Sequence, residues 1–351
     1  METVEVRTSP HVHGAPSVAT IMRNVVYALL PICIFATYQF GLSAVALIIV
    51  TTLACIFTES FFNRISGTSD SLGDFSAVIT GVLLALTLPP GFPLWMAAVA
   101  GFIAIALGKK LFGGLGFNVF NPALVGRAFV QAAFPVAITT WTPSLTAARF
   151  TEFIPSTLTF PFAVPAAVDQ WNAQVAVDAF SGATPLALSK FENIPTDTFL
   201  LLFGTTAGSA GETSALLILL CGLYLIFRNM LDWRIPAAVL LGAFLTEEAF
   251  HLFDSARFPD PWFMLFSGGL MLGAMFMASD MVGSPVTPVG VWIFGLLIGF
   301  LTIIIRLFGG LNEGIMYAIL LGNAASPLID AATQPRVYGV TEAKIFGKKV
   351  D

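Results

Sequence analysis

The residues with the clearest chemical potential stand in a short run between two long apolar blocks, Asp178-Ala179-Phe180-Ser181-Gly182-Ala183-Thr184-Pro185-Leu186. Ser181, Gly182 and Ala183 are small, so they leave the approach to the Thr184 hydroxyl open, and glycine tolerates a bend of the backbone. A hydroxyl presented in this way can accept a phosphoester. Taken alone, the run is also compatible with an ordinary small-residue turn before a proline.

The same run resembles the D-x-x-[ST]-G-A-T signature on which a flavin transferase attaches FMN through a phosphoester bond to the last threonine. This resemblance implies that the Thr184 hydroxyl displaces AMP from FAD and retains covalent FMN. Asp178 is then expected to be recognised by the transferase during maturation. Because a flavin passes one or two electrons, the run predicts an electron carrier.

The composition indicates a polytopic membrane protein. The 351-residue chain has 56% hydrophobic and only 11% charged residues, whereas soluble domains carry about 25% charged residues. The net charge of -5 is modest, and the chain contains no basic tract of the kind that binds nucleic acid. The chain therefore needs lipid around it, and nucleic acid is not an expected partner.

The apolar stretches predict an all-α integral membrane fold with about ten transmembrane helices, because a helix needs ~20 residues to cross the hydrocarbon core. The stretches are continuous and long, which argues against the short alternating strands of a β-barrel. Five precede the polar run and five follow it. They cover residues 21–39, 41–61, 74–89, 93–110, 119–137, 212–229, 235–253, 262–280, 288–306 and 312–330.

The two halves resemble one another when the chain is shifted by 196 residues. This shift places 111–115 (LFGGL) on 307–311 (LFGGL) and Gly126 on Gly322, which indicates an internal repeat. Five spans per half is an odd number, so the second copy is expected to have inverted topology and to enclose a midplane site with the first. Proline and glycine are expected to break the paired segments 74–89 and 262–285.

Basic residues predict the orientation and the domain boundaries. Eleven of them flank the spans on the side of the termini, and four flank the other side. Both termini are therefore expected in the cytoplasm, and the flavin loop in the periplasm of a cell inner membrane. The predicted segments are a cytoplasmic N-terminal segment at 1–20, a first five-helix repeat at 21–137, a periplasmic loop at 138–211, a second repeat at 212–330 and a cytoplasmic tail at 331–351.

Nearly the whole chain resembles the NqrB/RnfD family, the membrane subunits of the Rnf ion-translocating electron-transport complex and of the sodium-pumping quinone reductase. The chain departs from the more usual family pattern at Ser279-Asp280-Met281, although the aspartate is kept. Beside the flavinylation run, the matching stretches are 74–77 (DFSA), 88–90 (LPP), 116–123 (GFNVFNPA), 208–214 (GSAGETS), 232–236 (DWRIP), 278–280 (ASD), 284–285 (SP), Asn323 and 327–330 (PLID).

The resemblance implies a subunit that relays electrons between ferredoxin and NAD through covalent FMN while its complex translocates H+ or Na+. It also implies a noncovalent flavin among the helices, riboflavin being the candidate. The implied partners are the other Rnf subunits, including a second flavinylated subunit facing the periplasm and iron-sulfur subunits, and a flavin transferase. The chain has no dinucleotide-binding glycine turn in a βαβ setting and no clustered cysteines, so NAD and ferredoxin are expected to bind to partners.

Two further groups of polar residues are candidate sites, and no metal site is expected. Asn118 and Asn121 are candidates for the second flavin or midplane site, although buried amides are more often simply satisfied by hydrogen bonds. Glu247, Glu248 and Asp280 are candidates for an ion path, because charged groups at membrane depth are costly and frequently functional. Snorkelling or helix capping is the competing explanation for charges near helix ends.

Two other functions remain open for this pattern. An inverted five-span repeat with broken helices is also how channels and small-solute transporters are built, and fold alone does not separate them from an electron carrier. A purely structural anchor for redox partners is the second alternative.

Overall fold

The computed structural model describes residues 17–67, 71–163, 184–192, 196–204, 206–255, 257–310 and 312–335. Asp178, Ser181, Gly182 and Ala183 of the flavinylation run lie outside the described residues. Every regular element in the described ranges is a helix, which confirms the all-α prediction. Five helices are long and apolar enough to cross a membrane: α1 (Val18–Phe40), α2 (Leu42–Ser66), α11 (Arg234–Phe253), α14 (Pro288–Phe308) and α15 (Ile315–Thr333).

The other five expected spans contain shorter helices. α3 (Ser76–Thr87) and α5 (Pro122–Ala133) have 12 residues each, and α10 (Ala215–Phe227) has 13. α4 (Leu94–Ile105) is continued by the π-helical turn η2 (Ala106–Lys110). The expected span 262–280 is divided into α12 (Pro261–Phe266), α13 (Leu270–Leu272) and the π-helical turn η4 (Gly273–Met277). Ten full-length spans in an inverted repeat therefore stay a prediction.

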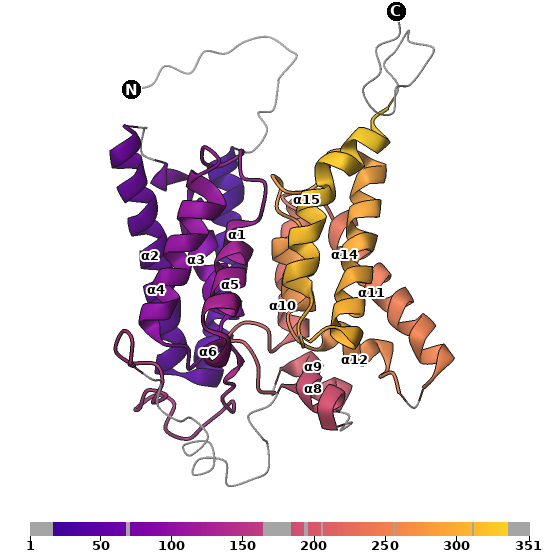
Figure 1. The fold of residues 1–351 in the computed structure, drawn as a ribbon, viewed down its shortest axis with the longest axis horizontal. Coiled ribbons are helices and arrows are strands. Elements are labelled where there is room, and N and C mark those ends of the chain that lie inside the picture. The colour runs from indigo at the N-terminus through magenta and orange to yellow at the C-terminus, as the bar shows by residue number, and fades with distance from the viewer. Residues whose placement is uncertain are drawn as a thin grey trace, which may run out of the picture.

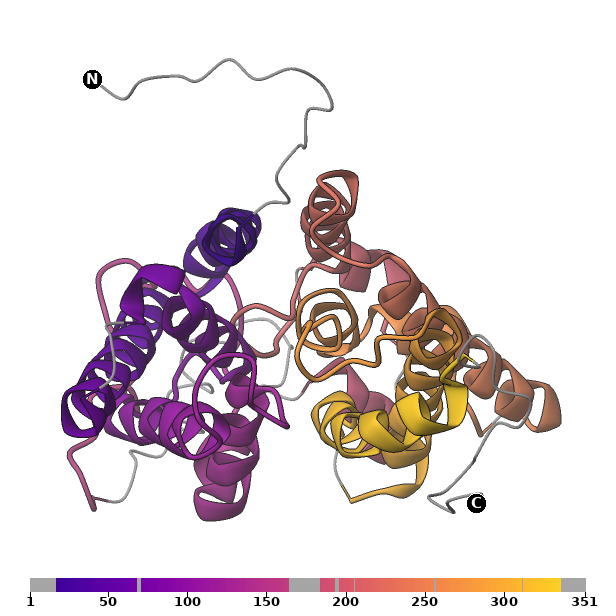
Figure 2. The same cartoon turned by 90° about the horizontal axis from the view of Figure 1, so that it is seen from above.

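The chain forms two helical bundles that lie side by side (Figures 1 and 2). α1 to α5 make the first bundle and α10 to α15 the second. α1 begins and α15 ends at one end of the molecule, whereas three short helices lie at the opposite end (Figure 1). We call this opposite end the α8 end; its short helices are α6 (Pro135–Thr139), α8 (Pro185–Ala187), which the π-helical turn η3 (Leu188–Glu192) continues, and α9 (Thr198–Phe203).

The interface between the bundles, here called the seam, carries polar contacts as well as apolar packing. α1 meets α10, and α5 meets α15. The Tyr224 hydroxyl lies 2.9 Å from Asn24 Oδ1, and Asn121 Nδ2 donates to the Met277 carbonyl at 3.3 Å. The seam therefore joins residues far apart in the chain through specific hydrogen bonds.

Glycines at matched positions allow the same close packing in both bundles. A Cβ atom added at Gly126 of α5 would lie 2.7 Å from the Ala100 carbonyl oxygen of α4. At the matching Gly322 of α15, a Cβ atom would lie 2.9 Å from Ile298 Cγ1 of α14. The shift of 196 residues therefore pairs equivalent packing positions as well as similar sequence.

This packing predicts that Gly126→Ala destabilises the protein, even though alanine favours a helix by up to about 1 kcal/mol over glycine. The backbone oxygen of Ala100 cannot rotate away, and overpacking of this kind costs about 1–3 kcal/mol. Thermal unfolding in detergent should show a lower midpoint for Gly126→Ala. Gly310→Ala is the control, because no atom lies within 4 Å of the added Cβ. Equal midpoints for the two variants would contradict this account of the packing.

Candidate functional site

Thr184 lies at the α8 end, where it forms the N-cap of α8. Its hydroxyl accepts a hydrogen bond from the Ala187 amide at 3.3 Å, and the residue is only 5% exposed. Proline at the first position of α8 suits this cap, because its missing N–H would be unpaired there in any case. The Thr184 hydroxyl is thus held inward, beside a small cavity of about 10 Å³ that Glu212 and Glu313 also line.

Charged side chains gather at the seam beside this cavity. Arg127 of α5 donates from Nη2 to Glu313 Oε2 at 2.6 Å, which ties the first bundle to the segment before α15. Glu212 precedes α10, interacts electrostatically with both residues and is 8% exposed. One oxygen of Glu212, Oε2, has no hydrogen-bond partner among the described residues. Thr184 therefore shares its cavity with a buried carboxylate that is incompletely paired.

Arg306 compensates for the break between α12 and α13. Its guanidinium donates to the Met264 carbonyl at 2.6 Å and to the Ser267 carbonyl at 3.0 Å. Carbonyl groups freed by a broken helix are costly to bury without donors, so this arginine satisfies what the break exposes. Arg306 also interacts electrostatically with Glu212, Glu247 and Glu313.

Lys190 of η3 fastens the segment after Thr184 to the second bundle. Its Nζ donates to the carbonyls of Arg306 at 2.7 Å and Gly309 at 2.5 Å, at the C-terminus of α14. A cation at this position is favoured by the unpaired carbonyls and the helix dipole. Burial lowers the pKa of the Lys190 ammonium from its ordinary value. The α8–η3 segment is thereby positioned against α14.

The predicted midplane residues come together at a second cavity between the bundles. This central cavity has a volume of about 100 Å³, and Asn118, Asn121 and Asp280 all line it. Asn121 caps α5, accepting from the Ala123 amide at 3.0 Å, and also reaches Met277 across the seam. Asn118 Nδ2 donates to the Phe120 carbonyl at 3.2 Å, while its Oδ1 has no partner among the described residues. Asn118 Oδ1 can therefore accept a hydrogen bond from a ligand in this cavity.

Glu247 and Glu248 do not reach the central cavity with Asp280. Glu247 is fully buried in α11, and neither of its carboxylate oxygens has a hydrogen-bond partner among the described residues. Glu248 is partly exposed. His251, one turn on from Glu247, contacts the Phe258 carbonyl through Nδ1 at 2.8 Å. The acidic candidates therefore do not share one site: Asp280 lines the central cavity, whereas Glu247 interacts with Arg306.

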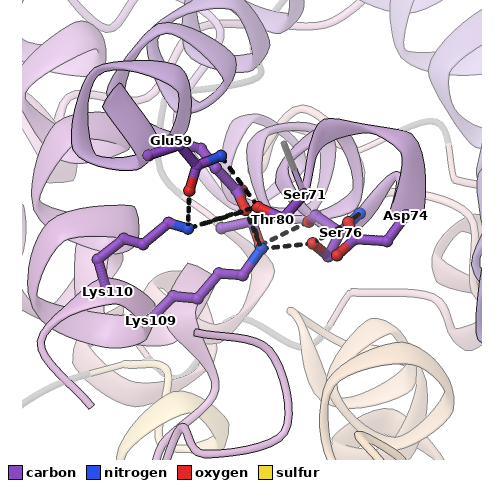
Figure 3. A network of polar contacts seen from close by, with 8 residues as sticks. Glu59, Ser71, Asp74, Ser76, Thr80, Lys109 and Lys110 are labelled. Carbon is purple, nitrogen blue, oxygen red and sulfur yellow. Dashed lines mark hydrogen bonds and ion pairs between the residues drawn. The ribbon is translucent and has the colours of Figure 1, made fainter. Parts of the chain in front are cut away.

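A buried ion-pair network beside the central cavity was not anticipated from the sequence (Figure 3). Lys109 of η2 is 1% exposed; its Nζ lies 2.6 and 2.8 Å from the two carboxylate oxygens of Glu59 on α2. The same Nζ donates to Ser76 Oγ at 2.5 Å, and the Ser76 hydroxyl donates to Asp74 Oδ1 at 2.5 Å. Lys109 also lines the central cavity. The wall of the central cavity therefore contains a cation, Lys109, that is fully hydrogen-bonded.

The signal for this network was present as charges inside or at the ends of apolar spans. Glu59 falls within the expected span 41–61, and Lys109 and Lys110 end the expected span 93–110. Lys110 donates to Asn63 Oδ1 at 2.5 Å and lies 3.5 Å from Glu59. Pairing these charges needed the packing of α2 against α4, which no local pattern in the sequence gives.

We expect Lys109→Met to destabilise the protein by about 3–5 kcal/mol, because it leaves the Glu59 carboxylate buried without its partner. The double variant Glu59→Gln/Lys109→Met should be more stable than Lys109→Met alone, since the unpaired charge is then absent. Denaturant unfolding in detergent measures both. Lys110→Met is the matched control, with a smaller loss expected from its longer, 3.5 Å contact. A loss as large for Lys110→Met as for Lys109→Met would contradict the assignment.

Comparison with known proteins identifies the family. Residues 5–339 match the model of the NQR2, RnfD, RnfE family. The chain is 40% identical to the D subunit of the Na(+)-translocating ferredoxin:NAD(+) oxidoreductase complex of Acetobacterium woodii, over 97% of this chain and 96% of that protein. It is 39% identical to the D subunit of the proton-translocating ferredoxin:NAD(+) oxidoreductase complex of Clostridium ljungdahlii, over 95% and 96%.

A third relative is the D subunit of the ion-translocating oxidoreductase complex of Alcanivorax borkumensis, which is 39% identical over 95% of this chain and 96% of its own length. The match thus spans both helical bundles and the segment between them. The chain belongs to the NQR2, RnfD, RnfE family.

Proposed function

We propose that this chain is the membrane-embedded D subunit of an Rnf-type complex that couples electron transfer between ferredoxin and NAD to translocation of H+ or Na+. Relatives bearing that name align with almost the full chain. Within the complex, the chain relays electrons through FMN attached to Thr184. The position of Thr184 carries this second part of the proposal: the threonine that ends the flavinylation run lies at the seam, beside buried charges from both bundles.

Thr184 must leave its described position before FMN can be attached. Its hydroxyl is buried, and the adjoining cavity of about 10 Å³ is far below the ~300–1,000 Å³ of typical ligand sites. The turn from Thr184 to Ala187 is held at the hydroxyl by one hydrogen bond of 3.3 Å, which a local opening breaks at modest cost. Attachment therefore goes with a rearrangement of this turn.

A larger cavity beside η3 suits the flavin better. It has a volume of about 440 Å³, within the usual range for a ligand site, and it adjoins the α8 turn through Leu186. Phe191, Phe258 and Phe308 supply aromatic surface for a flat ring system. Lys190 and Arg257 supply positive charge for the phosphate. FMN bound here supplies one- and two-electron chemistry, while these residues hold and orient it.

The noncovalent flavin fits the central cavity less well. At about 100 Å³ the cavity is smaller than the ~300 Å³ lower bound for typical ligand sites, so riboflavin does not fit without movement of the surrounding helices. The unpartnered Asn118 Oδ1 supports a polar ligand there. Riboflavin is the proposed ligand of this cavity once the surrounding helices have moved apart.

The proposed cellular setting follows from the same assignment. The chain is placed in the cell inner membrane with both termini in the cytoplasm and the α8 end facing the periplasm. Its partners are the other Rnf subunits, among them a second flavinylated subunit at the periplasmic face and iron-sulfur subunits that deal with ferredoxin and NAD. A flavin transferase is needed for maturation. The placement of α6, α8 and α9 opposite the beginning of α1 and the end of α15 supports this orientation (Figure 1).

Thr184→Val is expected to abolish covalent flavin on this subunit and to stop ferredoxin-dependent NAD reduction by the complex. Valine has a similar shape but no hydroxyl to carry the phosphoester. In-gel fluorescence after denaturing electrophoresis measures the flavin, and NAD reduction is followed in the purified complex. Thr206→Val is the control, because Thr206 lines the same small cavity as Thr184 and lies outside the flavinylation run; this variant should keep its fluorescence.

A wild-type chain without fluorescence, after coexpression with its transferase, would overturn the flavin part of the proposal. A channel or small-solute transporter, which needs no flavin, would then be the better explanation. Solute uptake into proteoliposomes containing the chain would test that alternative.

A further inference from the structure

A group of charged residues extends from the seam at the α8 end into the second bundle. Arg127 comes from α5, Glu247 from α11 and Arg306 from α14, while Glu212 and Glu313 precede α10 and α15. Arg127, Glu212, Glu247 and Arg306 are all less than a tenth exposed, and the Glu313 side chain is 12% exposed. We call these five residues the seam cluster. Three carboxylates and two guanidinium groups make up this cluster, and Arg306 interacts with all three carboxylates.

The described contacts use both guanidinium groups in other ways. Arg127 forms its ion pair with Glu313. Arg306 donates two hydrogen bonds to the carbonyls at the α12–α13 break. Lys190, the other cation near this point, is bound by two carbonyls of α14. Burying an ionised carboxylate without a partner is so unfavourable that such a group takes up a proton instead.

Glu212 is the carboxylate best placed to hold that proton. Its Oε2 is buried without a partner among the described residues and lies beside the cavity that Thr184 lines. A second carboxylate, Glu313, lines the same cavity, and its interaction with Glu212 favours the neutral form, whereas the interactions of Glu212 with Arg127 and Ser209 oppose it. Glu247 also lacks hydrogen bonds within the described part of the chain, but it does not line this cavity, and the Arg306 guanidinium interacts with it.

The size of the cavity excludes a hydrated metal cation. About 10 Å³ is close to the lower limit for a single water molecule. A sodium ion with its hydration shell does not fit, whereas a proton needs no space.

We propose that the seam cluster binds one proton on Glu212, in the cavity that Thr184 lines. This protonation site is built from both helical bundles and does not depend on the flavin.

Infrared spectroscopy of the purified complex tests the proposal, because a protonated carboxylic acid absorbs above the carboxylate bands. The wild type should show this band over a range of neutral pH, and Glu212→Gln should lose the intensity of one carboxyl group. Thr184→Val, which carries no FMN, should keep the band. Glu152→Gln is the control: this carboxylate is exposed to solvent, so the band should be unchanged.

Several outcomes would overturn the proposal. These are a wild type without the band, a band kept in Glu212→Gln but lost in Glu247→Gln, and a band that disappears at constant pH as sodium is added. If Glu212→Gln does not fold, Glu212→Asp provides the second test, because it keeps a carboxyl group and should shift the band. In-gel fluorescence of the same samples reports the flavin independently, so loss of the flavin and absence of the proton are distinguished.

Discussion

Buried polar groups must find partners, and this requirement shapes the protein at each point where a helix stops inside the apolar bundles. The break between α12 and α13 frees carbonyl groups, and Arg306 of α14 donates to two of them. Asn121 begins α5 by capping it and reaches the second bundle at Met277. In an environment without water, each unpaired group costs several kcal/mol. The interactions that repair the breaks are therefore also those that hold the two bundles in register.

The same requirement brings charged side chains together near the seam. The carbonyl groups at the break need a donor, which is the buried Arg306. A buried guanidinium is in turn stabilised by carboxylates near it. Glu212, Glu247 and Glu313 all interact with Arg306. Thr184 lies beside this group because Lys190 fastens the following turn to the end of α14. The proposed electron carrier and the proposed protonation site thus share one structural origin, which is the broken helix of the second bundle.

Residue patterns along the chain predicted the helical class and the five long helices, because these depend on local apolar runs. The shortened helices were harder to anticipate. Proline and glycine mark the break after α3, but the division of α12 from α13 at Ser267–Gly269 has no proline. The Glu59–Lys109 pair joins residues 50 positions apart, and the seam cluster draws on five separate segments. Such sites depend on tertiary packing. Glu247 and Asp280 were recognised singly, yet their separation into two regions required the fold.

The central claim is that Thr184 carries the electron-relaying flavin. Tandem mass spectrometry of the chain, purified from membranes in which its transferase is present, tests this most directly. The account predicts that the peptide containing Thr184 gains the mass of FMN less one water and that the fragment ions place the gain on Thr184. An unmodified Thr184 peptide at full yield, or the gain on another residue, would contradict it.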